Sequence, residues 1–233
     1  MKKKPRPRSE LPGPALVVLF EDNHCLAVRK PAGMLTAGDK TGDATLLDLA
    51  RQYIKNKYAK PGNVYLGLVH RLDRPVSGVV LFACTSKAAA RLSEQFRTGR
   101  VRKIYQAWVE GTPAEPTGTL TDRLVKDRTR NVVRTVSADV SDARRAVLDY
   151  RTLKRTATAT LLEVRPHTGR PHQIRAQLAA RGLPIVGDVK YGARPARAGR
   201  ILLHGIELTF EHPVRRQPVS VRAPLPTDWS RGP

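Results

Sequence analysis

The chain is organised around a run of fourteen residues, His70-Arg71-Leu72-Asp73-Arg74-Pro75-Val76-Ser77-Gly78-Val79-Val80-Leu81-Phe82-Ala83. An acidic residue between two arginines, followed by a proline, a Ser-Gly turn and an apolar run, predicts a loop that delivers one carboxylate to the mouth of a buried strand. The neighbouring guanidinium groups favour the ionised form of Asp73, which suits a nucleophile better than a proton donor. On these residues alone, a structural ion pair that fixes a tight turn is an equally good interpretation.

The charge balance indicates the class of partner. The 233 residues carry 42 Lys and Arg against 20 Asp and Glu, a formal net charge of +22, and such a surplus is typical of proteins that bind a polyanion such as RNA or DNA. The basic residues are spread from end to end, which disfavours a membrane-surface helix. No apolar run approaches the ~20 residues of a membrane span, and the run at 16–20 is too short for a secretory signal. We therefore expect a cytoplasmic protein.

Composition divides the chain into three parts. Residues 1–14 are rich in proline and basic residues and hold little that could be buried, so we expect a disordered basic arm. Residues 15–225 show no linker and are predicted to form one domain, and residues 226–233 are expected to be a C-terminal tail. The two cysteines, Cys25 and Cys84, lie in apolar strand-like runs, which favours buried thiols over a disulfide or a metal site.

Hydrophobic periodicity and turn residues predict the elements on both sides of Asp73. Strands are expected at 15–20, 25–29, 65–69 and 79–84, and helices at 45–58 and from 86 to about 98. Asp43 or Thr45 can cap the first helix, and Gly99 can end the second. Asp73 is therefore expected between two core strands.

The strand predicted at 101–111 carries Lys103 and Tyr105 on one face, because side chains alternate along a strand. A tyrosine in a strand is more often a core residue with an exposed hydroxyl than a catalytic group, so the pattern alone favours a core role for Tyr105, with a catalytic role as the alternative. Further strands are expected between 117 and 165, and at 201–210 and 219–223. Ten or so strands and three helices without a regular alternation indicate an α+β fold with a largely antiparallel sheet.

The second informative block is Thr168-Gly169-Arg170-Pro171-His172-Gln173-Ile174-Arg175. A strand ends in the Thr-Gly turn, and Pro171 then stands where the first turn of a helix tolerates proline. Arg170, His172 and Arg175 are expected at the N-terminal end of that helix, where backbone N–H groups favour anions, so phosphate binding is the economical interpretation. A metal site is disfavoured, because His167 and His172 have no third ligand of suitable type nearby.

Five groups of residues, taken in order, resemble the successive motifs of the RluA-type pseudouridine synthases. They are Lys30-Pro31-Ala32-Gly33; His70-Arg71-Leu72-Asp73 with Ser77-Gly78; Lys103-Ile104-Tyr105 with Gly111; the block at 168–175 with Gly187-Asp188 and Tyr191-Gly192; and Leu203-His204 with His212-Pro213. Ordered motifs over residues 15–225 are a stronger signal than any one of them. The resemblance implies that family's catalytic domain, a mixed, largely antiparallel sheet flanked by a few helices, with a central RNA-binding cleft and without the S4-like module of many members.

The resemblance also implies roles for single residues. Asp73 corresponds to the catalytic carboxylate, which attacks either the uracil ring or the ribose anomeric carbon of the target uridine. Tyr105 corresponds to the tyrosine that stacks on the base and helps to move the C5 proton, and Arg175 to the basic residue that pairs with the carboxylate. Arg71 corresponds to an arginine that fills the stack left by a flipped uridine, with a phosphate contact as the simpler alternative. Further RNA contacts are expected from His70, Lys103, Arg170 and His172.

The activity that the resemblance implies is the isomerisation of one uridine to pseudouridine in tRNA or in a stem-loop of large-subunit rRNA. This chemistry requires no cofactor and no metal, and we expect a monomer without an obligate protein partner or membrane association. Two alternatives remain: a catalytically silent RNA-binding protein of the same fold, and a base-excising hydrolase, which would need a second carboxylate. Three positions depart from the family pattern, Val76 for Thr, Pro171 for Thr or another polar residue, and Gly205 for Ala.

Overall fold

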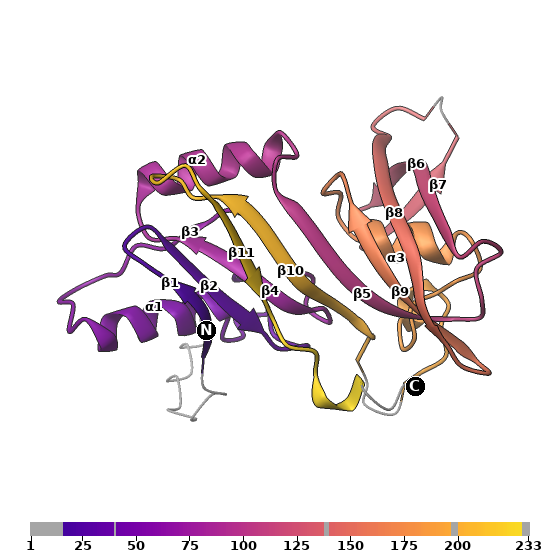
Figure 1. Ribbon diagram of the computed structural model, residues 1–233, viewed down its shortest axis with the longest axis horizontal. Coiled ribbons are helices and arrows are strands. Elements are labelled where there is room, and N and C mark those ends of the chain that lie inside the picture. The colour runs from indigo at the N-terminus through magenta and orange to yellow at the C-terminus, as the bar shows by residue number, and fades with distance from the viewer. Residues whose placement is uncertain (1–15, 40, 138–139, 197–199, 230–233) are drawn as a thin grey trace, which may run out of the picture.

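The computed structural model describes residues 16–39, 41–137, 140–196 and 200–229. Within these ranges, eleven strands form one sheet in the order β1-β2-β4-β10-β5-β9-β8-β6-β7, with β11 on β10 and β3 on β4. The strand pairs in this part of the chain are antiparallel except for β4 and β10, which run parallel over two residue pairs. The predicted α+β fold with a mixed, largely antiparallel sheet is confirmed (Figure 1).

The elements follow the predicted order. The strands are β1 (Val17–Glu21), β2 (Cys25–Lys30), β3 (Gly67–Leu68), β4 (Ser77–Ala83), β5 (Arg102–Glu110), β6 (Thr117–Asp127), β7 (Val132–Val136), β8 (Arg144–Arg155), β9 (Ala159–Pro166), β10 (Leu203–Glu211) and β11 (Pro218–Arg222). The helices are α1 (Leu46–Lys57), α2 (Ser86–Arg97) and α3 (Gln173–Ala179), with short 3-10 turns at Val189–Tyr191 and Thr227–Trp229. The strand expected at 65–69 is reduced to two residues, and α3 begins two residues later than Pro171.

Strands β2 and β4 are buried on both faces, because a helix covers each face. The side chains that face α1 include Leu26, Val28, Val80 and Phe82. The side chains that alternate with them, Cys25, Ala27, Val79 and Leu81, face α2 on the other side. Each fully buried aliphatic or aromatic side chain contributes about 1.5–3 kcal/mol. This two-sided core makes β4 a rigid base for the loop that precedes it.

Gly78 is needed where β4 crosses β10. Its φ angle is +134°, and a Cβ atom placed there would lie 2.4 Å from the carbonyl oxygen of Gly205. No side chain fits between the two backbones, so the two strands approach each other directly after the Asp73 loop. Gly205 in turn lies against the ring of Tyr105, since a Cβ on Gly205 would be 3.3 Å from that ring. The departure from the family pattern at Gly205 therefore lets the Tyr105 ring pack close to the β10 backbone.

The other half of the sheet, β9-β8-β6-β7, curls around α3 (Figure 1). Ala176 of α3 packs with Leu124, Val133 and Ala146 from three strands of this half. Trp229 packs against Trp108 beyond the boundary expected at residue 225, so that the packed core includes part of the expected tail. The arm expected at 1–14 lies outside the described residues. Among the described helices none is long and apolar enough to cross a membrane.

Candidate active site

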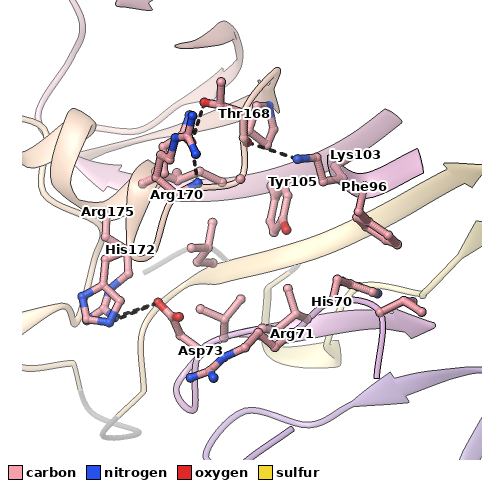
Figure 2. A pocket seen from close by; sticks show the side chains of 18 of the residues that line it. His70, Arg71, Asp73, Phe96, Lys103, Tyr105, Thr168, Arg170, His172 and Arg175 are labelled. Atoms are coloured by element: carbon pink, nitrogen blue, oxygen red, sulfur yellow. Dashed lines mark hydrogen bonds and ion pairs between the residues drawn. The ribbon is translucent and has the colours of Figure 1, made fainter. Parts of the chain in front are cut away.

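A cleft with two connected parts lies beside the Asp73 loop. The inner pocket has a volume of about 440 Å³, and its own lining includes His70, Phe96, Lys103, Tyr105 and Thr168 (Figure 2). The basic groove has a volume of about 730 Å³, and its own lining includes residues 35–39, Arg74, Lys126, Asn131 and Lys190. Both parts are lined by Arg71, Leu72, Asp73, Gly169, Arg170, His172 and Arg175. Asp73 therefore lies where the inner pocket and the basic groove meet.

Lys30 and Thr36 hold the loop that carries Asp73. The ammonium group of Lys30 is fully buried and donates to the carbonyl oxygens of Pro31, Met34 and Arg74 at 3.1, 2.6 and 3.0 Å. Burial lowers the pKa of Lys30 to about 7, although the charge of Asp73 acts in the opposite direction. The Thr36 hydroxyl donates to the carbonyl of Leu72 at 2.8 Å and accepts its N–H at 3.2 Å. The loop is thus fixed on both sides of Asp73.

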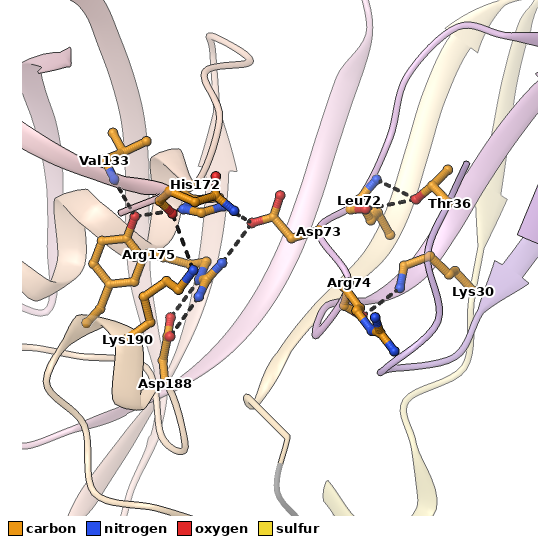
Figure 3. A network of polar contacts seen from close by, with 12 residues as sticks. Lys30, Thr36, Leu72, Asp73, Arg74, Val133, His172, Arg175, Asp188 and Lys190 are labelled. Atoms are coloured by element: carbon orange, nitrogen blue, oxygen red, sulfur yellow. Dashed lines mark hydrogen bonds and ion pairs between the residues drawn. The ribbon is translucent and has the colours of Figure 1, made fainter. Parts of the chain in front are cut away.

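Asp73 shares one guanidinium group with a second carboxylate (Figure 3). Nη1 of Arg175 lies 3.1 Å from Oδ2 of Asp73, while Nε and Nη2 donate to the two oxygens of Asp188 at 2.7 and 2.8 Å. Burial acts to lower the pKa of Arg175, but the two carboxylates outweigh burial and raise it. The predicted pairing of Arg175 with Asp73 is therefore present. Because Asp73 and Asp188 bind the guanidinium, the phosphate binding expected at this helix start stays a prediction for Arg170 and His172.

His172 also approaches Asp73. Its Nε2 atom lies 3.7 Å from Oδ2 of Asp73, and its Nδ1 atom lies 2.8 Å from the hydroxyl of Tyr191. Burial lowers the pKa of His172, against the opposing effect of Asp73. A neutral ring at this position does not add a positive charge for an RNA phosphate. The structure thus places His172 beside the carboxylate and the groove at once.

Tyr105 and Lys103 enter the inner pocket from β5, on the face that strand alternation predicted. Burial raises the pKa of the Tyr105 phenol, and the nearby charge of Asp73 raises it further. A phenol that stays protonated at neutral pH stacks on a base but does not readily accept a proton. Lys103 donates to the carbonyl of Thr168 at 3.1 Å, and burial lowers its pKa to about 8. Lys103 is then largely cationic at neutral pH.

The remaining predicted RNA contacts differ in how firmly they are held. His70 stacks on Phe96 with ring centroids 4.5 Å apart and accepts the Leu81 N–H at 2.9 Å, and burial lowers its pKa to about 3. Any contact of His70 with RNA is therefore made by a neutral ring. Nε of Arg170 donates to the carbonyl of Arg145 at 3.0 Å. Arg71 is exposed and has no ion-pair partner among the residues that the structure describes.

A family model described as RNA pseudouridylate synthase matches residues 24–180. The chain belongs to this family. It is 38% identical over 234 residues to "Ribosomal large subunit pseudouridine synthase D" of Xanthomonas campestris, which covers 93% of this chain and 68% of that protein. It is 32% identical over 236 residues to "tRNA pseudouridine synthase C" of Vibrio cholerae, covering 92% of this chain and 93% of that protein. The fold matches a structure of "Human RNA Pseudouridylate Synthase Domain Containing 4" with a TM-score of 0.77, at 24% identity and with 92% and 90% of the two chains covered.

Membership of this family makes the chain an RNA pseudouridine synthase, an isomerase. The second carboxylate that a hydrolase would need is present in space as Asp188, but both of its oxygens bind Arg175 and its side chain is only 1% exposed. It is not free to activate a water in the pocket. The geometry therefore gives a base-excising hydrolase little support.

One group of possible metal ligands occurs among the described residues, outside the cleft, and consists of Asp22, Cys25 and His212. Nδ1 of His212 accepts the N–H groups of Val214 and Arg215, so Nε2 carries the proton and donates to Asp22 at 2.8 Å. Asp22 also accepts two backbone N–H groups and the guanidinium of Arg215. These hydrogen bonds occupy the polar atoms of Asp22 and His212, so the cluster links two turns of the chain.

Sequence reasoning missed three residues of the site. Asp188 and Tyr191 were noted only as parts of the family pattern, although both contact the residues beside Asp73. Gln173 was expected only as a helix residue within the family block at 168–175, but its side chain binds Arg170, Thr168 and Val147 and so fixes the turn between β9 and α3. For Asp188 the available signal was a carboxylate within the otherwise apolar segment 183–189, and no comparable signal marked Tyr191 or Gln173.

Proposed function

We propose that this enzyme isomerises a uridine that is flipped out of structured RNA, and that Asp73 is its nucleophile. The observation that carries the proposal is the position of Asp73 at the boundary between the inner pocket and the basic groove. Arg175 binds Oδ2, and Oδ1 has no hydrogen-bond partner among the described residues. A carboxylate with one oxygen held and the other free is prepared for attack on a bound electrophile.

The reaction balances without an oxidant, a reductant or a further co-reactant. Asp73 attacks either the uracil ring or the anomeric carbon C1′, and the bond between C1′ and N1 breaks. The uracil turns within the inner pocket, and a bond forms between C1′ and C5 as the carboxylate is released. The C5 proton is lost to solvent, and N1 gains a proton. Tyr105 stacks on the base during the turn, a role that suits its buried, protonated phenol.

The inner pocket suits a single extruded base. Its volume of about 440 Å³ lies within the range of small-ligand pockets, and its walls combine apolar surface with a few polar groups. Removing a base from a stack costs a few kcal/mol. Arg71 is exposed at the mouth of the pocket (Figure 2), and its planar guanidinium can stack in the vacated space. We therefore assign Arg71 to holding the RNA open.

The basic groove suits the RNA backbone next to the flipped nucleotide. Its lining carries Arg74, Lys126 and Lys190 in addition to Arg71 and Arg170. Neutralising phosphates with such groups supplies most of the sequence-independent affinity for RNA. The names of the relatives give two substrate classes, tRNA and large-subunit rRNA. We carry both classes into the test, and we expect the modified uridine to lie in a stem-loop of one of them.

Replacement of Asp73 by Asn tests the nucleophile. The change keeps the shape of the side chain and removes its charge, so we expect loss of product with RNA affinity retained. Release of tritium from RNA labelled at uridine C5 measures turnover, and filter binding of the same RNA measures affinity. Asp43→Asn is the matched control, because Asp43 is exposed and pairs with Arg74, directly after Asp73. Product formation by Asp73→Asn at the wild-type rate would refute the assignment.

Pseudouridine mapping identifies the substrate. We expect one or a few uridines in tRNA or large-subunit rRNA to stay unmodified in cells that lack the protein. Wild-type protein should restore each modification, and Asp73→Asn should not. If the RNA pattern stays unchanged when the protein is absent, the tRNA and rRNA assignments both fail. If purified protein instead releases free uracil from RNA, the reaction is hydrolysis.

A further inference from the structure

His172 has a backbone conformation that few residues adopt. Its φ and ψ angles are 49° and 20°, in the left-handed region, directly before the first residue of α3. This conformation costs about 1–3 kcal/mol for most residues other than glycine, and such strain gathers at functional sites. The His172 side chain does not cap the helix. In this conformation the His172 ring instead points toward Asp73 (Figure 3).

The hydroxyl of Tyr191 determines which nitrogen of His172 carries the proton. That hydroxyl accepts the backbone N–H of Val133 at 2.9 Å, and it lies 2.8 Å from Nδ1 of His172. Because the hydroxyl oxygen already accepts the Val133 N–H and its hydrogen has no other acceptor among the described contacts, we infer that it donates that hydrogen to Nδ1. The proton of the neutral ring is then on Nε2, the atom 3.7 Å from Oδ2 of Asp73. The ring thus presents an N–H donor to the carboxylate.

Two donors therefore converge on the same oxygen of Asp73. Arg175 binds Oδ2 at 3.1 Å, and the Nε2–H of His172 faces the same atom. A distance of 3.7 Å is too long for a hydrogen bond, so a small movement of the ring would be needed to form one. Closing it would hold the carboxylate plane with Oδ1 directed away from both donors. That oxygen is the one available for attack.

The Tyr191 hydroxyl also connects the His172 ring to the basic groove. Val133 is the residue of β7 that pairs with Lys126 of β6, and Lys126 and Asn131 line the groove. Lys190, next to Tyr191, donates to the carbonyl of Asn131 at 3.3 Å. RNA bound at Lys126 and Asn131 would thus contact the neighbours of two residues: Val133, which donates to the Tyr191 hydroxyl, and Lys190, which precedes Tyr191 in the chain. Contact with RNA is then a means of moving the His172 ring toward Asp73.

We propose that His172 is a positioning residue for Asp73, that Tyr191 fixes its Nε2–H form, and that RNA on the β6–β7 hairpin closes the contact. The proposal rests on the proposed nucleophile and adds the means by which one of its oxygens is selected. It requires no charge on the histidine. The charged groups that face the ring are Asp73, Arg175, Lys190 and Lys126.

Variants at His172 separate the donor from the backbone. His172→Asn suits the left-handed conformation but is too short to reach Asp73, whereas His172→Gln can place an amide N–H near the position of Nε2 but tolerates that backbone less well. We expect Asn to be the more stable protein and Gln the faster enzyme. If His172 had a purely structural role, the more stable of the two variants would also be the faster enzyme. His167→Asn, at an exposed histidine paired with Asp149, is the matched control.

The tyrosine variant tests the other half of the proposal. Tyr191→Phe keeps the ring that lies 4.9 Å from the guanidinium of Arg175 but removes the hydroxyl. We expect the single-turnover rate of tritium release to fall about ten- to a hundredfold, in line with the cost of small misplacements at reacting groups, with RNA affinity within twofold of wild type. The double variant with His172→Asn should fall no further. Tyr53→Phe, whose hydroxyl binds Glu21 away from the cleft, should match wild type.

The RNA for these assays is total tRNA or large-subunit rRNA, labelled at uridine C5 and taken from cells that lack the protein. Wild-type rates in Tyr191→Phe and His172→Asn, with Asp73→Asn inactive, would overturn this proposal and leave the nucleophile intact. Turnover by Asp73→Asn would instead overturn the nucleophile. Equal rates for His172→Asn and His172→Gln, or losses of rate that only follow losses of stability or affinity, would show that the donor has no role.

Discussion

The pair formed by Arg175 and Asp188 gives the sharpest prediction for stability. Their side chains are 6% and 1% exposed, and the guanidinium binds both oxygens of Asp188. Asp188→Asn keeps the volume but leaves a buried guanidinium with Asp73 as its only carboxylate among the described residues. Removing one partner of a buried ion pair costs about 3–5 kcal/mol. We therefore expect the free energy of unfolding to fall by about that amount.

Urea denaturation followed by circular dichroism measures this change, with the midpoint lowered and the slope unchanged. For a domain of this size, about 3–5 kcal/mol corresponds to a fall in melting temperature of about 6–20 °C. Glu94→Gln is the matched control, because it removes the same charge from a pair with Arg97 whose side chains are 42% and 74% exposed. An exposed pair of this kind contributes about 0–1 kcal/mol. If Asp188→Asn costs no more than Glu94→Gln, the reasoning about this pair is refuted.

Three further predictions concern binding and the fold. Because burial lowers the pKa of Lys103 to about 8, its positive charge is lost as the pH rises through 8. RNA affinity should therefore weaken between pH 7 and pH 9 in the wild type and change less in Lys103→Arg. Equal pH profiles of the two proteins would contradict a contact between Lys103 and RNA. Affinity should fall steeply with salt, and Lys126→Ala should make the slope of log affinity against log salt about one unit shallower; an unchanged slope would remove Lys126 from the RNA interface. Gly78→Ala should yield insoluble or unfolded protein, because its Cβ would meet the Gly205 backbone at 2.4 Å, whereas Gly38→Ala, with open space around it, should fold as the wild type does.

The Asp73 loop could be predicted from sequence because its determinants are local. A proline, a Ser-Gly turn and a run of apolar residues follow Asp73 within ten positions, and they specify a turn and a buried strand wherever they occur. The helix caps are local in the same sense, and Thr45 and Thr85 cap α1 and α2. The contact between Asp73 and Arg175 spans 102 positions. Only the resemblance to a family predicted it, because no local pattern encodes a contact of that separation.

The start of α3 shows where local rules gave the wrong result. Pro171 is acceptable in the first turn of a helix, and so the sequence placed the start there. In the structure, Gln173 binds the Arg170 N–H through its side chain, and the ring of His172 is held by Tyr191. These tertiary contacts keep His172 in the left-handed conformation, which cannot continue a helix backward. The contact with Tyr191 depends on the position of the β6–β7 hairpin, and residues 168–175 alone do not specify that position.

The sharing of Arg175 between two carboxylates answers a difficulty in the proposed chemistry. A nucleophilic carboxylate must be ionised, but a full ion pair with one arginine would weaken it as a nucleophile by neutralising its charge. Asp188 takes the bidentate side of the guanidinium, and Asp73 receives one donor at 3.1 Å. The three groups together carry a formal net negative charge, so Arg175 only partly neutralises the charge of Asp73. Asp188→Asn should therefore lower the single-turnover rate in protein that remains folded, because Arg175 would then bind Asp73 alone; a rate equal to wild type below the melting transition would show that Asp188 serves stability only.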